Sequence, residues 1–123
     1  IKPAIDRGEA DYLGSVGPER RDQLLGNALA LLHPINFDEP FGLSVIESMA
    51  TGTPVIAVNR GSMPELIDHG KTGFLVSNAD EAAACVADIQ KINRRMCRKT
   101  VEERFSAKRM AADYLDLYTK ILG

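Results

Sequence analysis

The sequence predicts an α/β protein in which helices flank a parallel, Rossmann-like sheet. Short β-like apolar runs alternate along the chain with amphipathic helical stretches, which is the pattern of βαβ units. The chain has 123 residues, of which 45% are hydrophobic and 26% charged, and this composition is typical of a folded globular domain. No linker-like tract or internal repeat divides it. We therefore expect one domain over residues 1–123.

The first third of the chain predicts two strands with a helix between them. Asp11–Val16 is expected to be a short strand, and Pro18–Gly26 a helix whose first position accepts proline readily. Ala28–His33 is the next apolar run and predicts a second strand. Pro34 then opens a polar loop of about eight residues, which is long for a connection between a strand and a helix.

The middle of the chain predicts the rest of the sheet. Leu43–Thr51 has helical periodicity, and Pro54–Val58 is a β-branched run typical of a buried parallel strand. Residues 62–65 have the S-x-x-E spacing of a capping box, which predicts a short helix over Met63–Asp68. Gly73–Val76 is the last expected strand.

Two amphipathic helices complete the chain. The first is expected after Asn78, a favourable N-cap residue, and the second starts near Ser106. Each has an apolar stripe that must pack against another apolar surface. The stripes are Ala82, Val86, Ile89 and Ile92 in the first helix, and Met110, Tyr114, Leu117 and Ile121 in the second.

Composition and charge exclude several classes of function. Fifteen Lys+Arg residues against seventeen Asp+Glu residues give a formal net charge of -2, so nucleic acid is not an expected partner. The longest apolar run, Ala28–Leu32, is far shorter than the roughly 20 residues that cross a bilayer. Cys85 and Cys97 are expected to be reduced thiols, which fits a cytoplasmic location. Neither histidine has a partner at metal-ligand spacing, so no metal site is expected.

The residues that could carry chemistry lie where the polar loop meets the next helix. Glu39 precedes a proline, so its backbone should be extended and should lie beyond the carboxyl end of the preceding strand. Open parallel sheets bind ligands at that edge. Gly42 has no Cβ and lets a ligand approach the backbone. The free N–H groups of Gly42, Leu43 and Ser44 predict an anion site that suits a phosphate.

Glu47 lies one helical turn beyond Leu43, at the border of the face formed by Leu43, Ile46 and Ala50 that we expect to be buried. A carboxylate at such a border is costly unless it is paired, and a ligand hydroxyl is one possible partner. Two other interpretations are open. Glu47 could be a rim residue in water, with Glu39 a loop acid near a helix N-terminus, or the two acids could form a hydrolase pair.

Glu39 and Glu47 form an E-x7-E motif within the string EPFGLSVIESMATGTPVIA at residues 39–57. GSMPELI follows at residues 61–67 and GKTGFLV at residues 70–76. Together these segments resemble the C-terminal, donor-binding half of the family 4 (group 1) retaining glycosyltransferases, which have the GT-B fold. The resemblance extends less specifically to residues 12–16 and to the terminal helix.

This resemblance implies a nucleotide-diphosphate sugar as the donor substrate and no cofactor. It implies that Glu39 contacts the sugar hydroxyls and stabilises the charge that develops at the anomeric carbon. Glu47 would accept hydrogen bonds from the ribose hydroxyls, and the backbone of Phe41–Leu43 would hold the sugar and the diphosphate. Val16 matches a family position that lies beside the base.

The same resemblance implies what the chain would need for activity. Such enzymes usually require no metal, because basic side chains and backbone amides neutralise the leaving diphosphate. Those basic side chains, and the acceptor-binding N-terminal domain, would precede Ile1. We therefore expect the parent to be a transferase, its acceptor unknown, and the 123-residue piece to be inactive alone. The alternative is a non-catalytic α/β module that binds a nucleotide or a partner domain. Self-association through an exposed part of the final helix is also expected.

Overall fold

The computed structural model describes residues 1–123 and confirms the predicted α/β architecture. Three parallel strands form one sheet in the order β1-β2-β3. Leu31 pairs with Val55, and Val55 pairs with Gly73, so the carboxyl ends of the strands share one edge. The strands are β1 (Leu31–His33), β2 (Val55–Val58) and β3 (Gly73–Val76).

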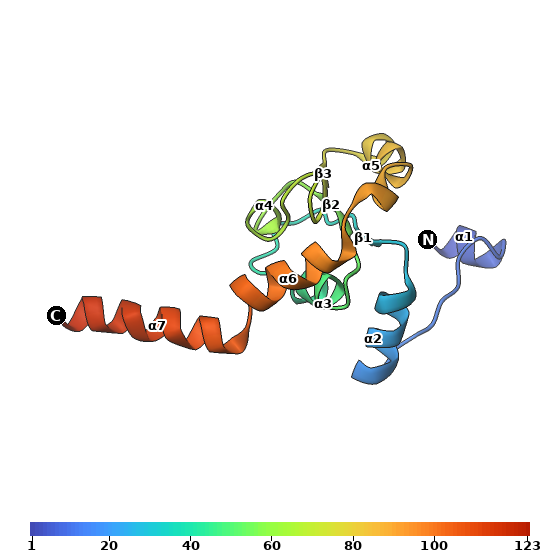
Figure 1. The fold of residues 1–123 in the computed structure, drawn as a ribbon. Coiled ribbons are helices and arrows are strands. Elements are labelled where there is room, and N and C mark those ends of the chain that lie inside the picture. Colours follow the sequence, from blue (N-terminus) through green and yellow to red (C-terminus); the bar gives the residue numbers. More distant parts are fainter.

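Helices surround this sheet in the centre of the molecule, and the two terminal helices lie apart from it (Figure 1). Most predicted helices are present, with ends that differ by one to four residues from those expected. The helices are α1 (Lys2–Asp6), α2 (Pro18–Asn27), α3 (Leu43–Ala50), α4 (Met63–Leu66), α5 (Ala79–Val86), α6 (Arg94–Arg104) and α7 (Ala107–Leu122), with a 3₁₀ turn at Ile89–Lys91.

The hydrophobic core is built around α3. This helix packs against α2 and α6 and against strands β1 and β2, while α5 contacts β2 and β3. Because strand β2 is the middle strand, helices or loops cover it on both faces and its residues are almost all buried. All fourteen buried residues of the core cluster lie between Val45 and Val101, so this central segment alone supplies the core.

Residues 11–16 form no strand, and this prediction is wrong. The segment runs as an irregular coil from α1 to α2, with the Tyr12 side chain 79% exposed and Leu13 50% exposed. Only three strands form the sheet, and β1 pairs on one side with β2. A strand needs a neighbour to satisfy its backbone groups, and this apolar run has none. Helix α1, which no sequence pattern predicted, precedes the coil.

The predicted capping box at residues 62–65 is also wrong. Ser62 precedes α4 but has αR geometry and makes no side-chain cap bond. Its hydroxyl instead donates a 2.6 Å hydrogen bond to the carbonyl of Phe41, twenty-one residues earlier. The short helix ends at Leu66 rather than Asp68, because Ile67 turns to extended backbone.

The stripe predicted for one helix after Asn78 is divided between α5, the 3₁₀ turn and the bend that precedes α6. Asn78 is the N-cap as predicted, and its side chain accepts from the Glu81 N–H at 2.9 Å. However, α5 ends at Val86 and a 3₁₀ turn follows. Asn93 then caps a new helix, α6, by accepting from the Arg95 N–H at 3.0 Å.

Arg94, at the start of α6, connects distant parts of the chain. Its guanidinium donates to the carbonyls of Gly26 and Ala28, each at 2.9 Å, and to the Thr53 hydroxyl at 2.7 Å. Helix α6 is therefore fixed to the turn between α2 and β1.

Helix α7 extends away from the rest of the molecule (Figure 1). None of its sixteen residues is buried, so the stripe predicted from its periodicity is present but uncovered. The exposed large apolar side chains are Met110, Tyr114, Leu115, Leu117, Tyr118, Ile121 and Leu122. Neither α7 nor any other helix has the length and apolar composition needed to cross a membrane.

Both cysteines are free thiols, as predicted. Cys85 is half-buried, while Cys97 is fully buried and its thiol donates to the Thr72 carbonyl at 3.5 Å. Burial raises the pKa of the Cys97 thiol to about 11, because the charged thiolate is disfavoured away from water.

Candidate functional site

The loop between β1 and α3 is held in place by the turn that follows β2. The Ser62 N–H donates to the Glu39 carbonyl at 2.9 Å, and its hydroxyl donates to the carbonyl of Phe41. Arg60 Nε donates to the Asp38 carboxylate at 3.0 Å. Three hydrogen bonds, from one backbone donor and two side-chain donors, thus fix the segment that contains Glu39. This segment lies at the carboxyl edge of the sheet, as predicted from the sequence.

Two glycines make this close approach possible. A Cβ on Gly61 would lie 2.5 Å from the Glu39 nitrogen and 2.7 Å from its carbonyl oxygen. A Cβ on Gly42 would lie 2.8 Å from the Met63 terminal methyl. Both glycines also have positive φ, 57° at Gly61 and 100° at Gly42, a region that side-chain-bearing residues rarely adopt. At Gly61 the two loops touch backbone to backbone, whereas at Gly42 the space that a Cβ would need is filled by the Met63 and Leu66 side chains.

The start of α3 presents unpaired donors, as predicted. The N–H groups of Val45 and Ile46 donate to the Gly42 carbonyl at 3.1 and 3.2 Å, and these are the first bonds of the helix. The N–H groups of Leu43 and Ser44 have no preceding carbonyl within the helix to bond. With the positive end of the helix dipole, they form a place where an anion is stabilised.

The Glu39 side chain lies beside this helix start. Its γ-carbon is 3.7 Å from the position that a Cβ on Gly42 would occupy. Glu39 is half-buried, and its carboxylate makes no hydrogen bond or ion pair with the protein. Both carboxylate oxygens are therefore available to a ligand placed at the start of α3.

Glu47 is not a free rim residue, because it is held by a partner on α2. Its Oε1 atom forms an ion pair with Arg21 NH1 at a distance of 2.9 Å, and both side chains are about one-third exposed. The pair lies in a polar cleft of about 460 Å³. The lining residues are Arg21, Asp22, Glu47, Ala50, Thr51 and Arg98. Sequence analysis missed Arg21, since nothing in the spacing along the chain connects residues 21 and 47.

The buried face of α3 differs from the predicted one. Val45, Ile46 and Met49 are buried, whereas Leu43 is 67% exposed and Ala50 is half-buried. Leu43 is the first residue of the helix, and the buried part of α3 begins only at Val45. The exposure of Leu43 leaves the helix start open to solvent.

Phe41 connects the site to the end of α6. Its ring meets the Phe105 ring edge to face, with centroids 6.4 Å apart, and Arg104 lies 4.9 Å above the centre of the Phe105 ring. These residues and Met110 and Tyr114 of α7 line a cleft of about 240 Å³. The 44% exposed Phe41 ring thus stands between the start of α3 and the exposed face of α7.

Val16 stays apart from this cluster. It is half-exposed in the coil that leads into α2, and no hydrogen bond joins its backbone to the loop around Glu39. It is five residues from Arg21, which does reach α3.

The two histidines have different environments. His33 ends β1, and its Nε2 atom is buried without a hydrogen-bond partner. His69 Nδ1 accepts from the Leu75 N–H at 3.0 Å. No group of three His, Cys, Asp or Glu side chains lies close enough together to hold a metal ion.

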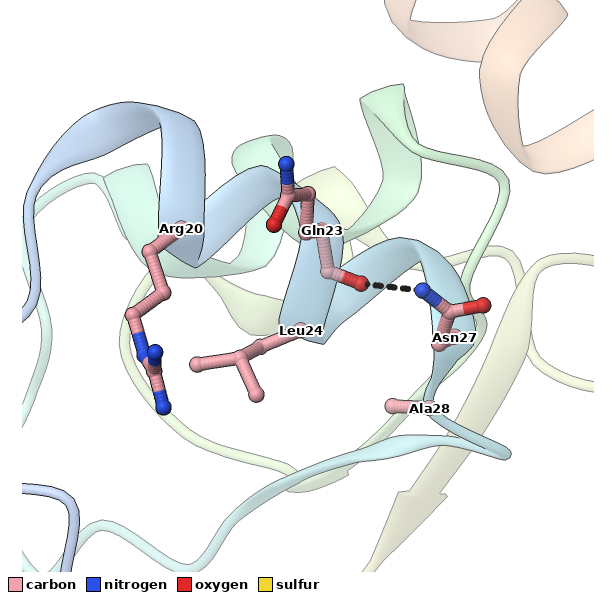
Figure 2. Close-up of a pocket in the computed structure, with 5 residues that line it drawn as sticks. All are labelled: Arg20, Gln23, Leu24, Asn27 and Ala28. Carbon is pink, nitrogen blue, oxygen red and sulfur yellow. Dashed lines mark hydrogen bonds between the residues drawn. The ribbon is translucent and has the colours of Figure 1, made fainter.

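A third cleft lies along another side of α2 and contains none of the predicted site residues (Figure 2). It measures about 500 Å³. Arg20 and Leu24 point into it, and the Asn27 amide donates to the Gln23 carbonyl at 2.8 Å (Figure 2). Arg20 and Arg21 therefore belong to different clefts although they are neighbours in sequence.

Comparison with known proteins gives a family for this arrangement. The model of the family described as glycosyl transferases group 1 matches residues 7–105, which include the β1–α3 loop, α3 and the turn after β2. The chain belongs to this family. The resemblance inferred from residues 39–76 is thereby confirmed.

Two curated relatives show how much of a complete protein the chain represents. It is 35% identical over 127 residues to a D-inositol 3-phosphate glycosyltransferase of Streptomyces avermitilis, an alignment that covers 96% of this chain and 27% of the relative. It is 40% identical over 85 residues to a probable sucrose-phosphate synthase of Thermosipho melanesiensis, covering 67% of this chain and 20% of that protein. The chain thus spans about a fifth to a quarter of the length of these relatives.

A solved structure supports the same fold. The crystal structure of Anabaena HepE in complex with UDP superimposes with a TM-score of 0.65 and 25% sequence identity. The match covers 80% of this chain and 29% of that protein. The three-stranded parallel sheet with its helices is therefore a part of a glycosyltransferase fold, as the sequence predicted.

Proposed function

We propose that this chain is the donor-binding part of a GT-B glycosyltransferase that transfers a sugar from a nucleotide-diphosphate sugar to an acceptor. The single observation that carries the proposal is the start of α3, where unpaired backbone N–H groups lie next to Glu39, whose carboxylate has no partner in the protein. A diphosphate suits the N–H groups, and sugar hydroxyls suit the carboxylate. Family membership and the UDP bound by the HepE structure support the same substrate class.

The proposed roles follow from this geometry and from the family motif. Glu39 contacts the hydroxyls of the donor sugar and stabilises positive charge as the anomeric carbon loses its bond to the diphosphate oxygen. The backbone of Phe41, Gly42, Leu43 and Ser44 stabilises the negative charge that the leaving diphosphate gains. The acceptor hydroxyl forms the new bond on the face that the diphosphate leaves, so the configuration is retained, and its proton is released.

Glu47 and Val16 are proposed to bind the nucleoside. Glu47 accepts hydrogen bonds from the ribose hydroxyls, for which its second carboxylate oxygen is free. Val16, in the coil before α2, lies beside the base. In this scheme no metal ion or cofactor takes part in the reaction.

Binding of UDP, GDP and ADP to this chain, measured by calorimetry, tests the proposal. One diphosphate should bind, and backbone NMR shifts should concentrate at residues 39–47. Glu47→Ala should weaken binding about 10-fold or more, because two hydrogen bonds to a charged group are lost. Absence of binding by this chain and again by the full-length parent, or shifts confined to another surface, would favour a non-catalytic interaction module.

We further propose that α7 packs against a second, acceptor-binding domain in the whole protein, and that two isolated chains associate through this face. The seven exposed large apolar side chains of α7 support the proposal. Sedimentation at rising concentration should show a dimer that Leu117→Lys abolishes. A strictly monomeric chain would rule out self-association.

We also propose a cytoplasmic location, which the two free thiols support.

A further inference from the structure

The ion pair between Arg21 and Glu47 is the only side-chain bond that joins α2 to α3. The other end of α2 is fixed differently: the Leu25 carbonyl accepts from the Thr53 hydroxyl at 2.5 Å, and the Gly26 carbonyl accepts from Arg94. Helix α2 thus has its own anchors away from the candidate site. The Arg21–Glu47 pair is therefore not needed to attach α2 to the domain.

Arg21 is itself held in a defined position. Its NH1 lies 2.9 Å from Glu47 Oε1 in the ion pair, while its Nε and NH2 each donate to Asp22 Oδ1 at 3.2 Å. The planar guanidinium thus connects two carboxylates, a geometry that the single ammonium of lysine does not reproduce. The other arginine of the cleft, Arg98, pairs with Glu102 at 2.8 Å and leaves Glu47 to Arg21.

The contact leaves Glu47 able to bind a second partner. A carboxylate offers about four lone-pair sites on two oxygens, and the ion pair with Arg21 involves Oε1 alone. Oε2 and the second lone pair of Oε1 stay available for two neighbouring hydroxyls. A ligand diol therefore does not have to displace Arg21, and it meets a carboxylate whose rotation is already restricted.

From this arrangement we infer that Arg21 is a positioning residue that orients the Glu47 carboxylate toward the ribose hydroxyls of the donor. The inference rests on the proposed function, because it takes the ribose as the ligand of Glu47. Arg21 acts through Glu47 and does not touch the nucleotide.

The test compares nucleotides with and without the 2′-hydroxyl. UDP, GDP and ADP are titrated into the chain by calorimetry, and the tightest binder is then compared with its 2′-deoxy form. The variants are Arg21→Ala, Arg21→Lys, Glu47→Ala and the double variant. Arg20→Ala is the matched control, since it removes the same charge from the same helix but points into the other cleft (Figure 2).

Arg21→Ala should weaken binding of the ribonucleotide about 3- to 10-fold, the range expected for loss of a partly exposed charge pair that orients a ligand group. It should weaken the 2′-deoxy form less, so the preference for ribose falls. Arg21→Lys should recover part of that preference. In the Glu47→Ala background, Arg21→Ala should change neither the affinity for the ribonucleotide nor that for its 2′-deoxy form. Arg20→Ala should match the wild type.

Different outcomes overturn different statements. If Glu47→Ala weakens binding but Arg21→Ala behaves like Arg20→Ala, Arg21 has no positioning role while the proposed function stands. Equal losses for the ribose and deoxyribose forms would mean that Arg21 acts on the phosphates, which also overturns the inference. If no nucleoside diphosphate binds either the wild-type chain or the full-length parent, the proposed function fails and the inference fails with it. Unchanged amide spectra of each variant exclude misfolding as the cause.

Discussion

Helices α3 and α7 are both amphipathic, yet the apolar face of α3 is buried and that of α7 is exposed. Helix α3 has eight residues, and four of them are buried. Helix α7 has sixteen, and none is buried. Apolar periodicity therefore predicts which side of a helix needs a partner, but it does not predict whether that partner lies in the same segment of chain.

Connectivity explains the difference. Helix α3 lies between β1 and β2, which pair with each other, so the chain must fold α3 back onto the sheet. Only Phe105 and Ser106 separate α7 from α6, and α7 does not connect two paired strands of the sheet. Nothing in the chain directs α7 toward the core.

The largest expected contrast between the two helices is in stability. Met49 is fully buried in α3, and Met49→Ala should lower the free energy of unfolding by about 2–5 kcal/mol, because it leaves a cavity in the core. Leu117 of α7 is 49% exposed, and Leu117→Ala should change the free energy of unfolding by less than about 0.5 kcal/mol. Urea unfolding of both variants measures the contrast. Equal losses would mean that α7 is packed in solution.

The next largest effect concerns the loop that supports α3. Gly61→Ala should destabilise the protein by about 2–3 kcal/mol, since it combines a positive φ with a collision against the Glu39 backbone. It should also abolish nucleotide binding by displacing Glu39. Gly70 has a φ of 80° but nothing within 4 Å, so Gly70→Ala should cost only the backbone strain, about 1 kcal/mol. Similar losses for both variants would contradict the close packing at Gly61.

A smaller effect is expected at Ser62. Ser62→Ala should lower the free energy of unfolding by about 1–2 kcal/mol, because the Phe41 carbonyl loses its donor. The same variant should broaden the NMR signals of the β1–α3 loop, not those of α4. Ser15→Ala, in the exposed coil, is the control and should be neutral. Loss of helix α4 instead of loop order would restore the capping-box interpretation.

These contrasts also show what the sequence could predict. The β-branched run at 55–58, the cap at Asn78 and the helix start near Ser106 were recognisable because strand burial and helix initiation are local properties. The strand expected at residues 11–16 was wrong for the opposite reason. A strand depends on a neighbour, and the local pattern contains no information about one.

In the candidate site, too, local features were predictable and long-range contacts were not. Glu39, Gly42 and the N–H groups at the start of α3 were predictable, since one loop-to-helix junction contains them all. The Arg21–Glu47 pair and the Ser62–Phe41 bond were not, because each joins residues more than twenty positions apart. The roles of these residues toward a donor remain predictions until binding is measured.

The smallest expected effect depends on pH and on Cys97. The unfolded thiol loses its proton near pH 9, whereas the buried thiol keeps it until about pH 11. Stability should be unaffected by this group below pH 9 and should fall by about 1 kcal/mol by pH 10, as the unfolded state gains the ionised form. Cys97→Ala should remove this part of the pH dependence. An identical slope in wild type and variant would refute the burial effect.

The contacts of Arg94 have a consequence for folding during synthesis. Its partners at Gly26, Ala28 and Thr53 leave the ribosome first, but their bonds form only after residue 94 has emerged. The chain between them closes a long loop, which is slow relative to local helix formation. The α2–β1 turn should therefore stay unprotected on nascent chains that end before α6, and become protease-resistant once α6 has been added.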